Sequence, residues 1–302
     1  MMGMLRRGGW IGCACGAPVR GERDAWPRVR HHRRSTGRCG QWPDRAPGNP
    51  DPKQRRAIAQ PRRTLMMGDR RGHANATHEE IRLSITWDGI TGADVLVDAQ
   101  VATRHALADA ARNGDWATML ALVAKERALV NATRLGGTSL RAPLHQAACG
   151  GAPKEVVAEL LRLGAWRMLR DAHGERPVDI AGRRGHRHLV DLLAPQPRRF
   201  VPGATLLAIQ RHFHAMILGR IAHLRVDALR LPELEPLLEL DAQAERMWFA
   251  VPGMYGGFAY ALHTEGDAAM LVSESWSRVA GGSGQRHEIT ADGCTLVDEG
   301  FV

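Results

Sequence analysis

A chain of 302 residues with 44% hydrophobic side chains can form one large domain or two modest ones and can bury a sizeable core. Its formal charge of +9 is unevenly placed: residues 1–65 contain 15 Lys and Arg against 4 Asp and Glu, a net charge of +11, whereas the other 237 residues contain 26 against 28, a net charge of −2. The larger part therefore has no basic excess that would draw it to nucleic acid or acidic lipid. No run of about 18 apolar residues is present, which argues against a membrane span.

The N-terminal segment 1–65 is rich in Arg, Gly, Pro and Trp and has no apolar periodicity. We expect it to be a disordered basic tail, because it cannot bury enough surface to offset its ordering entropy. It lacks the apolar core of a signal peptide. Two interpretations stay open: an arm that binds nucleic acid through its arginines, or translated sequence upstream of a native start at Met66 or Met67. Nucleic acid is an expected partner only if the tail is native.

Cysteine usage argues against a disulfide framework. The five cysteines are odd in number and scattered, at Cys13, Cys15, Cys39, Cys149 and Cys294. This pattern is typical of a reducing compartment, so we expect a cytoplasmic protein. The spacing of the first three, with His31 and His32 nearby, matches no structural zinc pattern, and we expect no metal and no cofactor.

After a partly ordered lead-in over residues 66–101, the region 102–195 contains an internal repeat. Three segments of eight residues align without gaps, and their starts lie 37 and 34 residues apart: Leu107–Gly114, Leu144–Gly151 and Val178–Gly185. Each is predicted to be a short helix ended by glycine, followed by a second helix with apolar residues at spacings of 3 and 4. The spacing is close to the ~33-residue period of one type of helical repeat.

Two motifs in the middle unit identify the resemblance. Ala142–Ala148 and Leu160–Ala165 resemble the Thr-Pro-Leu-His-x-Ala-Ala and Leu-Leu-x-x-Gly-Ala signatures of the ankyrin-repeat family, as found in bacterial proteins. The chain departs from the family pattern where Ala142 and Arg176 replace Thr, and where the first finger loop is lengthened through residues 135–139. The resemblance implies a stack of about three helix pairs with protruding finger loops that bind a protein partner, and a structural hydrogen-bonding role for His145. Because three units are about the minimum for a stable stack, we expect the C-terminal half to cap the last unit.

The same resemblance suggests which side chains contact the partner. These are polar or exposed positions of the finger loops and first helices: Arg134, Leu135, Ser139, Arg141, Gln146, His173, Glu175 and Arg176. We expect no catalytic residues among them.

Residues 196–302 are predicted to form an α+β domain, in which one helix packs on an antiparallel meander sheet. Apolar residues from Leu206 to Leu224 indicate a helix of about 20 residues. From Met247 the apolar period changes to 2 and predicts five strands, over residues 247–251, 258–263, 269–276, 286–290 and 294–298. Gly266-Asp267 and Asp292-Gly293 are hairpin signals. The aromatic residues Trp248, Tyr255 and Trp276 are expected in the core or at its rim.

A glycine-rich loop within residues 278–288 suggests an alternative function. The segment 274–288 resembles a module of bacterial proteins that has no assigned activity, so the resemblance adds no chemistry. Backbone N–H groups and basic side chains there could hold a small anion or a nucleotide-like ligand, with these residues as candidates: Arg278, Gly282, Ser283, Gly284, Arg286 and His287. A flexible or bulged hairpin whose glycines supply positive φ is the favoured explanation of this loop.

The sequence therefore favours a non-catalytic scaffold or regulator that binds a protein partner through its repeats. The alternative is a small-ligand sensor or enzyme at the glycine loop.

Overall fold

The computed structural model describes residues 85–300 except 225, 241–245, 267 and 279–281. The chain divides into two compact units, Met1–Gly68 and Asp69–Val302. The first unit lies wholly outside the described residues. So do the predicted tail, with its cysteines and two histidines, and the start of the lead-in. All structural statements below concern the second unit.

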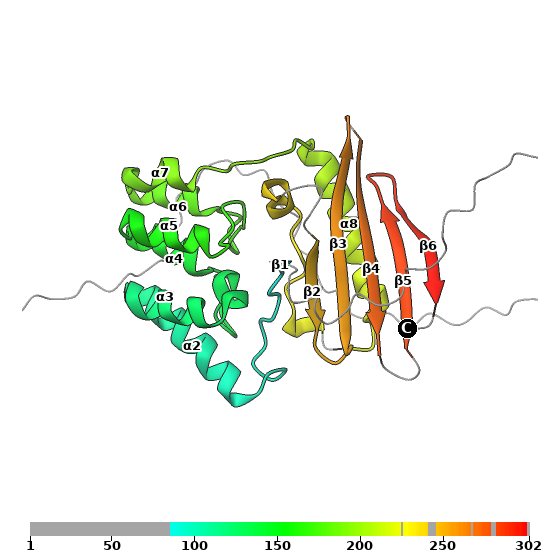
Figure 1. The fold of residues 1–302 in the computed structure, drawn as a ribbon, viewed down its shortest axis with the longest axis horizontal. Helices are drawn as coiled ribbons and strands as arrows, with labels where there is room; N and C mark the ends of the chain where they lie inside the picture. The colour runs from blue at the N-terminus through cyan, green and yellow to red at the C-terminus, as the bar shows by residue number, and fades with distance from the viewer. Residues whose placement is uncertain (1–84, 225, 241–245, 267, 279–281, 301–302) are drawn as a thin grey trace, which may run out of the picture. The chain divides into compact units, whose positions relative to one another are not determined.

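Six helices of the described region form three successive helix pairs (Figure 1). The pairs are α2 (Asp98–Asn113) with α3 (Trp116–Lys125), α4 (Pro143–Gly150) with α5 (Lys154–Arg162), and α6 (Pro177–Arg184) with α7 (Arg187–Leu193). A short 3-10 helix, η1 (Arg127–Asn131), follows the first pair. The predicted repeat starts Leu107, Leu144 and Val178 all lie in the first helix of a pair.

The three pairs turn in the same way between their helices. Each first helix is followed by a glycine with a left-handed φ, at Gly114 (74°), Gly151 (63°) and Gly185 (78°). The next backbone N–H returns to a small residue of the first helix: Asp115 to Ala110 (2.9 Å), Ala152 to Ala147 (3.0 Å) and His186 to Ala181 (2.9 Å). A left-handed residue at this position favours glycine because it carries no Cβ.

Small residues let the first helices of the pairs approach one another. Ala111, Ala147, Ala148 and Ala181 are buried in one apolar cluster with the larger residues of the second helices, which include Met119, Val157, Leu160 and Leu189. The predicted apolar stripe on each second helix therefore faces the inside of the stack.

A single sheet of the described region combines one strand that precedes the repeats in the chain with five strands that follow them. Among the described residues it has six strands in the order β1 to β6: β1 (Ile85–Thr86), β2 (Met247–Val251), β3 (Gly256–Glu265), β4 (Ala268–Ser277), β5 (Ser283–Ile289) and β6 (Cys294–Gly300). Strands β2 to β6 are antiparallel neighbours, as the short predicted turns require.

The prediction of a purely antiparallel sheet was wrong at one edge. β1, from the lead-in, pairs in parallel with β2, with Ile85 opposite Met247 and Thr86 opposite Trp248. A two-residue strand gives no readable alternation, and its partner lies more than 160 residues away in sequence, so no local pattern indicated it. The fold is thus α+β with a mixed sheet.

Helix α8 (Gly203–Arg220) covers one face of the sheet (Figure 1). It corresponds to the predicted helix but ends at Arg220, four residues before Leu224. Its buried residues Ile209, Phe213 and Ile217 pack with Phe249, Phe258 and Tyr260 in one core. The core also contains Trp87 from the lead-in and Ala142, Trp166, Met168 and Leu169 from the repeats. The helix pairs have a second core of their own, whose buried residues lie between Leu107 and Leu193.

Gly257 tests how closely this sheet is packed. A Cβ at Gly257 would lie 2.2 Å from the Phe249 carbonyl oxygen and 2.8 Å from the Trp248 ring, whereas a Cβ at Gly293 would meet nothing within 4 Å. We expect Gly257→Ala to lower the free energy of unfolding by about 1–3 kcal/mol through overpacking. Chemical denaturation measures the change, with Gly293→Ala as the matched control. Equal effects of the two substitutions would contradict this account.

Candidate functional site

The predicted partner-binding residues lie on two loops and one helix of the repeats. We call residues 134–141 the first finger loop and residues 170–176 the second finger loop. His173 is exposed, and Leu135 is buried with 4% exposure. The remaining predicted residues are half-buried: Arg134, Ser139, Arg141, Gln146, Glu175 and Arg176.

Two of these residues hold the loops together instead of facing outward. Leu135 lies inside the protein, so it cannot contribute to a partner surface, and the prediction for this residue is corrected. Arg141 has a side chain only 13% exposed and donates to Asp171 at 3.1 Å from the next loop. The Ala172 N–H also donates to the Ser139 carbonyl at 2.9 Å. The lengthened loop is thus bonded to the second finger loop through Arg141 and the Ser139 carbonyl.

Asp171 organises the second finger loop. Its side chain is fully buried, and its carboxylate accepts the backbone N–H groups of His173 (2.8 Å) and Glu175 (3.1 Å). The same carboxylate receives the Arg141 guanidinium, so the buried charge is paired and hydrogen-bonded. These bonds fix the shape of the second finger loop in the free protein.

The finger loops contact a segment of the C-terminal half. We call residues 229–240, which include the 3-10 helix η3 (Glu235–Glu239), the bracing segment. Glu235 accepts a two-pronged hydrogen bond from Arg170, at 2.8 and 2.9 Å, and a further bond from Arg176 at 3.0 Å. Burial raises the pKa of Glu235, but its hydrogen bonds and ion pairs with Arg170 and Arg176 outweigh burial, so the net pKa lies below the ordinary value.

Arg230 extends the same contact into the core. It donates at 2.5 Å to the Arg170 carbonyl and to Glu233, and its guanidinium lies 5.4 Å from the centre of the Trp87 ring. Trp87 stacks on Trp166 at 5.4 Å with an angle of 11° between the rings. Cation–π and stacking contacts of this kind join three distant parts of the chain.

These contacts show where the C-terminal half meets the repeats. It packs against the finger loops through the bracing segment. Arg176 is engaged with Glu235 and is therefore held within the protein. The second finger loop is thus bonded to the chain itself, although its His173 stays exposed.

His145 has the structural role that the resemblance implied. It is fully buried, its Nδ1 accepts the Ala142 N–H at 3.3 Å, and its Nε2–H donates to the Leu169 carbonyl at 3.0 Å. Burial lowers its pKa from 6.5 to about 4, so the neutral ring is present at neutral pH.

The glycine loop of the alternative function does not bring its candidates together. Arg286 and His287 are neighbours on β5, and successive side chains of a strand point to opposite faces. Arg286 lies on the face of Glu274, 3.8 Å from its carboxylate, whereas His287 faces α8. The predicted anion set is therefore split between two faces, and a single small anion cannot contact both basic residues.

The other members of that set lie around the hairpin. Gly282 has a left-handed φ of 76°, Ser283 and Gly284 begin β5, and Arg278 is exposed after β4. Residues 279–281 between them are outside the described residues. Gly282 fits the simpler interpretation, in which glycine serves the turn.

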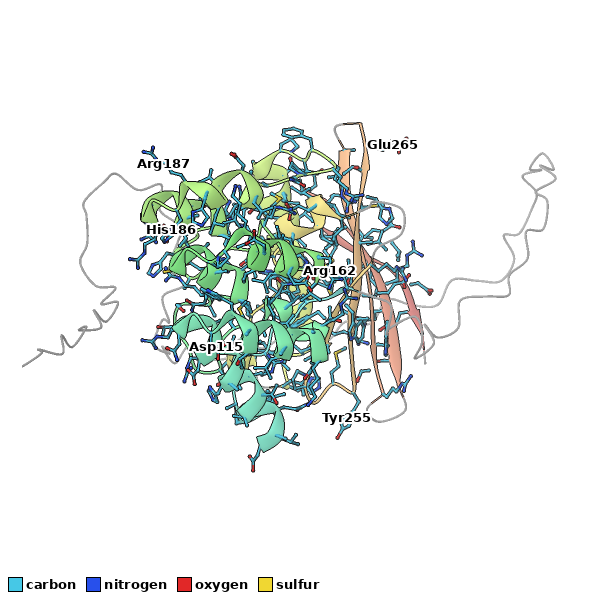
Figure 2. The ribbon with its side chains drawn as sticks, turned by 60° about the vertical axis from the view of Figure 1, so that its left-hand side comes forward. Asp115, Arg162, His186, Arg187, Tyr255 and Glu265 are labelled. Carbon is cyan, nitrogen blue, oxygen red and sulfur yellow. The ribbon has the colours of Figure 1, made fainter. Side chains whose placement is uncertain are left out.

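The aromatic residues near this loop have structural positions, with one exception. Trp248 and Trp276 stack at 4.5 Å on the sheet. Tyr255 is 77% exposed with a φ of 50°, and Figure 2 shows it at the surface. Its predicted place in the core or at the rim was therefore wrong.

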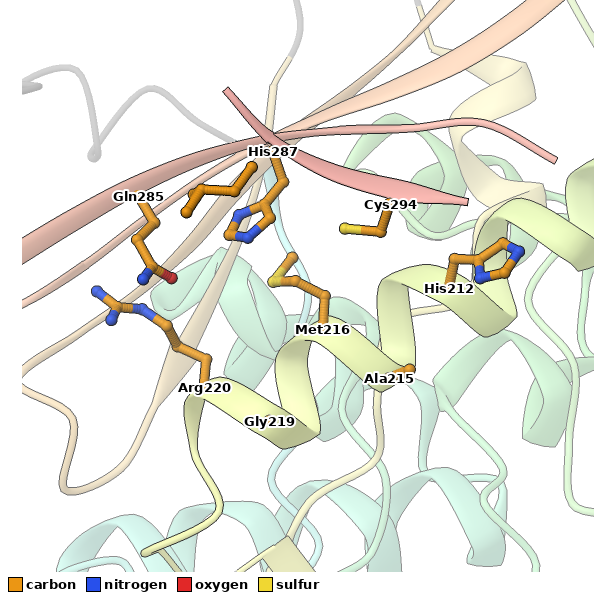
Figure 3. A pocket seen from close by; sticks show the side chains of 9 residues that line it. His212, Ala215, Met216, Gly219, Arg220, Gln285, His287 and Cys294 are labelled. Carbon is orange, nitrogen blue, oxygen red and sulfur yellow. The ribbon is translucent and has the colours of Figure 1, made fainter. Parts of the chain in front are cut away.

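Figure 3 shows a site that the sequence did not indicate, a groove between α8 and strands β5 and β6. His287 from β5 and Arg220 from α8 meet there, although 67 positions separate them in sequence. In the sequence, no signal distinguishes Arg220 from the other basic residues of this helix, such as Arg211.

Two searches of the described residues bear on other classes of site. No group of three or more His, Cys, Asp and Glu side chains there is placed to hold a metal ion. None of the described helices has both the length and the apolar character needed to cross a bilayer.

The Glu235 contact can be tested by substitution. Glu235→Gln removes the charge that receives Arg170 and Arg176, and we expect it to lower the free energy of unfolding by about 1–2 kcal/mol. The control is Glu159→Gln, which breaks the exposed pair with Arg162 (Figure 2) and should leave the thermal midpoint unchanged. If Glu235→Gln is as stable as the wild type, the bracing contact contributes nothing.

His145 predicts a pH dependence of stability. Because its pKa is about 4 in the folded state and 6.5 when unperturbed, the unfolded state binds more protons between these values. The contribution of His145 is complete above about pH 6.5 and decreases by about 3 kcal/mol as the pH falls to 4. His145→Gln keeps an acceptor for the Ala142 N–H but does not titrate. Unfolding measured from pH 4 to 7 should show a steeper decline for the wild type, and parallel curves would contradict the assignment.

No family model and no curated protein matches the chain. Among solved structures, a similar chain belongs to the structure described as the Bd0816 predatory endopeptidase from Bdellovibrio bacteriovorus in complex with the immunity protein Bd3460. The match has 26% sequence identity, covers 42% of this chain and 68% of that chain, and has a TM-score of 0.27. A TM-score this low carries no argument about fold or function.

Proposed function

We propose that this chain is a non-catalytic protein-interaction scaffold or regulator whose three helix pairs are ankyrin-type repeats. One observation supports the proposal above the others: three helix pairs repeat the same glycine turn and the same backbone bond at offsets of 37 and 34 residues. A repeated layer of this kind presents a continuous surface, which suits binding of a macromolecule better than chemistry on a small substrate.

The partner surface is assigned to the exposed side of the first helices. Arg112 and Arg183 occupy equivalent positions in the first and third layers, and both are exposed. Gln146 lies between them on α4 and is half-exposed. His173 and Glu175 of the second finger loop border this surface, and Glu175 pairs with Arg183 at 2.7 Å. A rigid polar surface on packed helices loses little conformational entropy on binding.

The proposal places the scaffold in the cytoplasm. Cys149 and Cys294, the cysteines of the described region, are both free thiols, which is compatible with a reducing compartment.

The alternative, an anion or nucleotide-like ligand at the glycine loop, has less support. It required Arg286 and His287 to act on one ligand, and β5 directs them to opposite faces.

Site-specific photo-crosslinking tests the proposed partner surface. A benzophenone amino acid is placed at Arg112 or at Gln146 on the first helices, and at Glu155 or at Ala158 on the exposed side of α5 as matched controls. We expect one protein to be crosslinked in cells from both first-helix positions, because they belong to one surface. The assignment would be overturned if the α5 positions crosslinked the same protein with equal yield. It would also be overturned if the two first-helix positions crosslinked unrelated proteins.

A further inference from the structure

The groove between α8 and strands β5 and β6, here called the α8 groove, has a volume of about 550 Å³. This volume lies within the range of small-molecule sites, roughly 300–1,000 Å³. Met216 and Arg220 line it from the helix, and Gln285, His287 and Leu296 line it from the two strands (Figure 3). It lies apart from the repeats that carry the proposed partner surface.

Arg220 is held in place at one end of the α8 groove. Its Nε donates to the Ser275 hydroxyl at 3.2 Å, and its Nη2 donates to the carbonyl and the hydroxyl of Ser283, both at 2.9 Å. Burial lowers the pKa of Arg220, but a guanidinium stays charged at neutral pH. With Nε and Nη2 occupied by described residues, Nη1 is the part of this fixed cation that can receive a ligand.

His287 supplies a second polar group that has no partner among the described residues. Its side chain is 8% exposed, and its buried Nδ1 makes no hydrogen bond there. A buried polar atom without a partner costs roughly 1–3 kcal/mol, so a ligand that bonds to it gains affinity. Burial and the charge of Arg220 lower the pKa of His287, which keeps the ring neutral and allows an Nδ1–H to donate.

The charges around the groove limit the class of ligand. Arg220 is the permanently charged side chain of the described lining. Glu299 is close enough to raise the pKa of both Arg220 and His287, and it accepts a hydrogen bond from Gln285 at 2.7 Å. Because Glu299 repels negative charge, and repels a dianion such as phosphate more strongly than a monoanion, a ligand bound at Arg220 is expected to carry a single negative charge.

Apolar side chains complete the groove beyond its polar end. Met216 and Ala215 on α8 face Leu296 on β6, which is 45% exposed. Burial of this exposed apolar surface would stabilise a ligand with a hydrocarbon body. Arg220, Gln285 and His287 lie at one end of the groove and His212 and Cys294 at the other, with Met216 between them (Figure 3). Polar groups beside an apolar stretch are typical of sites for amphipathic small molecules.

We propose that the α8 groove binds a small monocarboxylate with an apolar body, with its carboxylate at Arg220 Nη1 and His287 Nδ1 and its hydrocarbon against Met216 and Leu296. The assignment is independent of the repeats and of their partner.

Isothermal titration calorimetry on the full chain tests the ligand class, with sodium octanoate as the probe. We expect one octanoate to bind per chain, and we expect no binding of octylamine, which has the same hydrocarbon and the opposite charge. Inorganic phosphate should not compete. Absence of octanoate binding, or equal binding of octylamine, would overturn the proposal.

Two matched pairs of variants test the location. Leu296→Glu puts a negative charge into the groove and should weaken octanoate binding at least about tenfold, while Val297→Glu, at an adjacent and similarly exposed residue (44%) outside the lining, should not. Arg220→Gln should abolish binding, while Arg286→Gln, which removes the same charge from the other face of β5, should leave it intact. If Arg220→Gln does not fold, the glutamate pair still decides the question. Equal losses within the glutamate pair would overturn the assigned site.

Discussion

The contact between the finger loops and the bracing segment is the constraint on which the rest of the described structure depends. Glu235 accepts hydrogen bonds from Arg170 and Arg176. Arg230 donates a hydrogen bond to the Arg170 carbonyl and makes a cation–π contact with Trp87, which stacks on Trp166. Charged groups at partly buried positions are stable only when they are paired and hydrogen-bonded, and each of these has a defined partner. The contact lies beside a core that the lead-in and the sheet share with Ala142, Trp166, Met168 and Leu169 of the repeats, while the helix pairs keep a second core of their own.

This constraint narrows the surface on which a partner could bind. The finger loops of a free repeat stack would be open, but here Arg170 and Arg176 of the second finger loop are bonded to Glu235 of the bracing segment. The exposed side of the first helices remains, and the left-handed glycines and small alanines that repeat from layer to layer hold it in a fixed geometry. Under the proposed function, this arrangement would present a preformed surface to the partner, and the bracing segment would contribute rigidity.

The two faces of the sheet carry different polar groups, because successive side chains of a strand point to opposite faces. On the face away from α8, Glu274 pairs with Arg246 at 2.9 Å and lies 3.8 Å from Arg286, beside the stacked Trp248 and Trp276. On the face toward α8, His287 meets Arg220 in a groove with an unpaired buried nitrogen. Arg286 and His287 are adjacent on β5, so their side chains lie on opposite faces of the sheet. For this reason, polar residues that are clustered in the sequence belong to two separate groups in the structure.

The sequence by itself determined the local elements. Periods near 3.6 placed the helix pairs and α8, a period of 2 placed β2 to β6, and glycines at fixed offsets marked the helix ends, because these features depend on neighbours within a few residues. The motif around His145 likewise indicated its structural role. Only the tertiary structure decided which distant residues contact one another. Examples are the parallel pairing of β1, the burial of Leu135, the hydrogen bond from Arg176 to Glu235 and the shared groove of Arg220 and His287. Each joins segments far apart in the chain, and local periodicity carries no information about such contacts, since they depend on how whole elements pack.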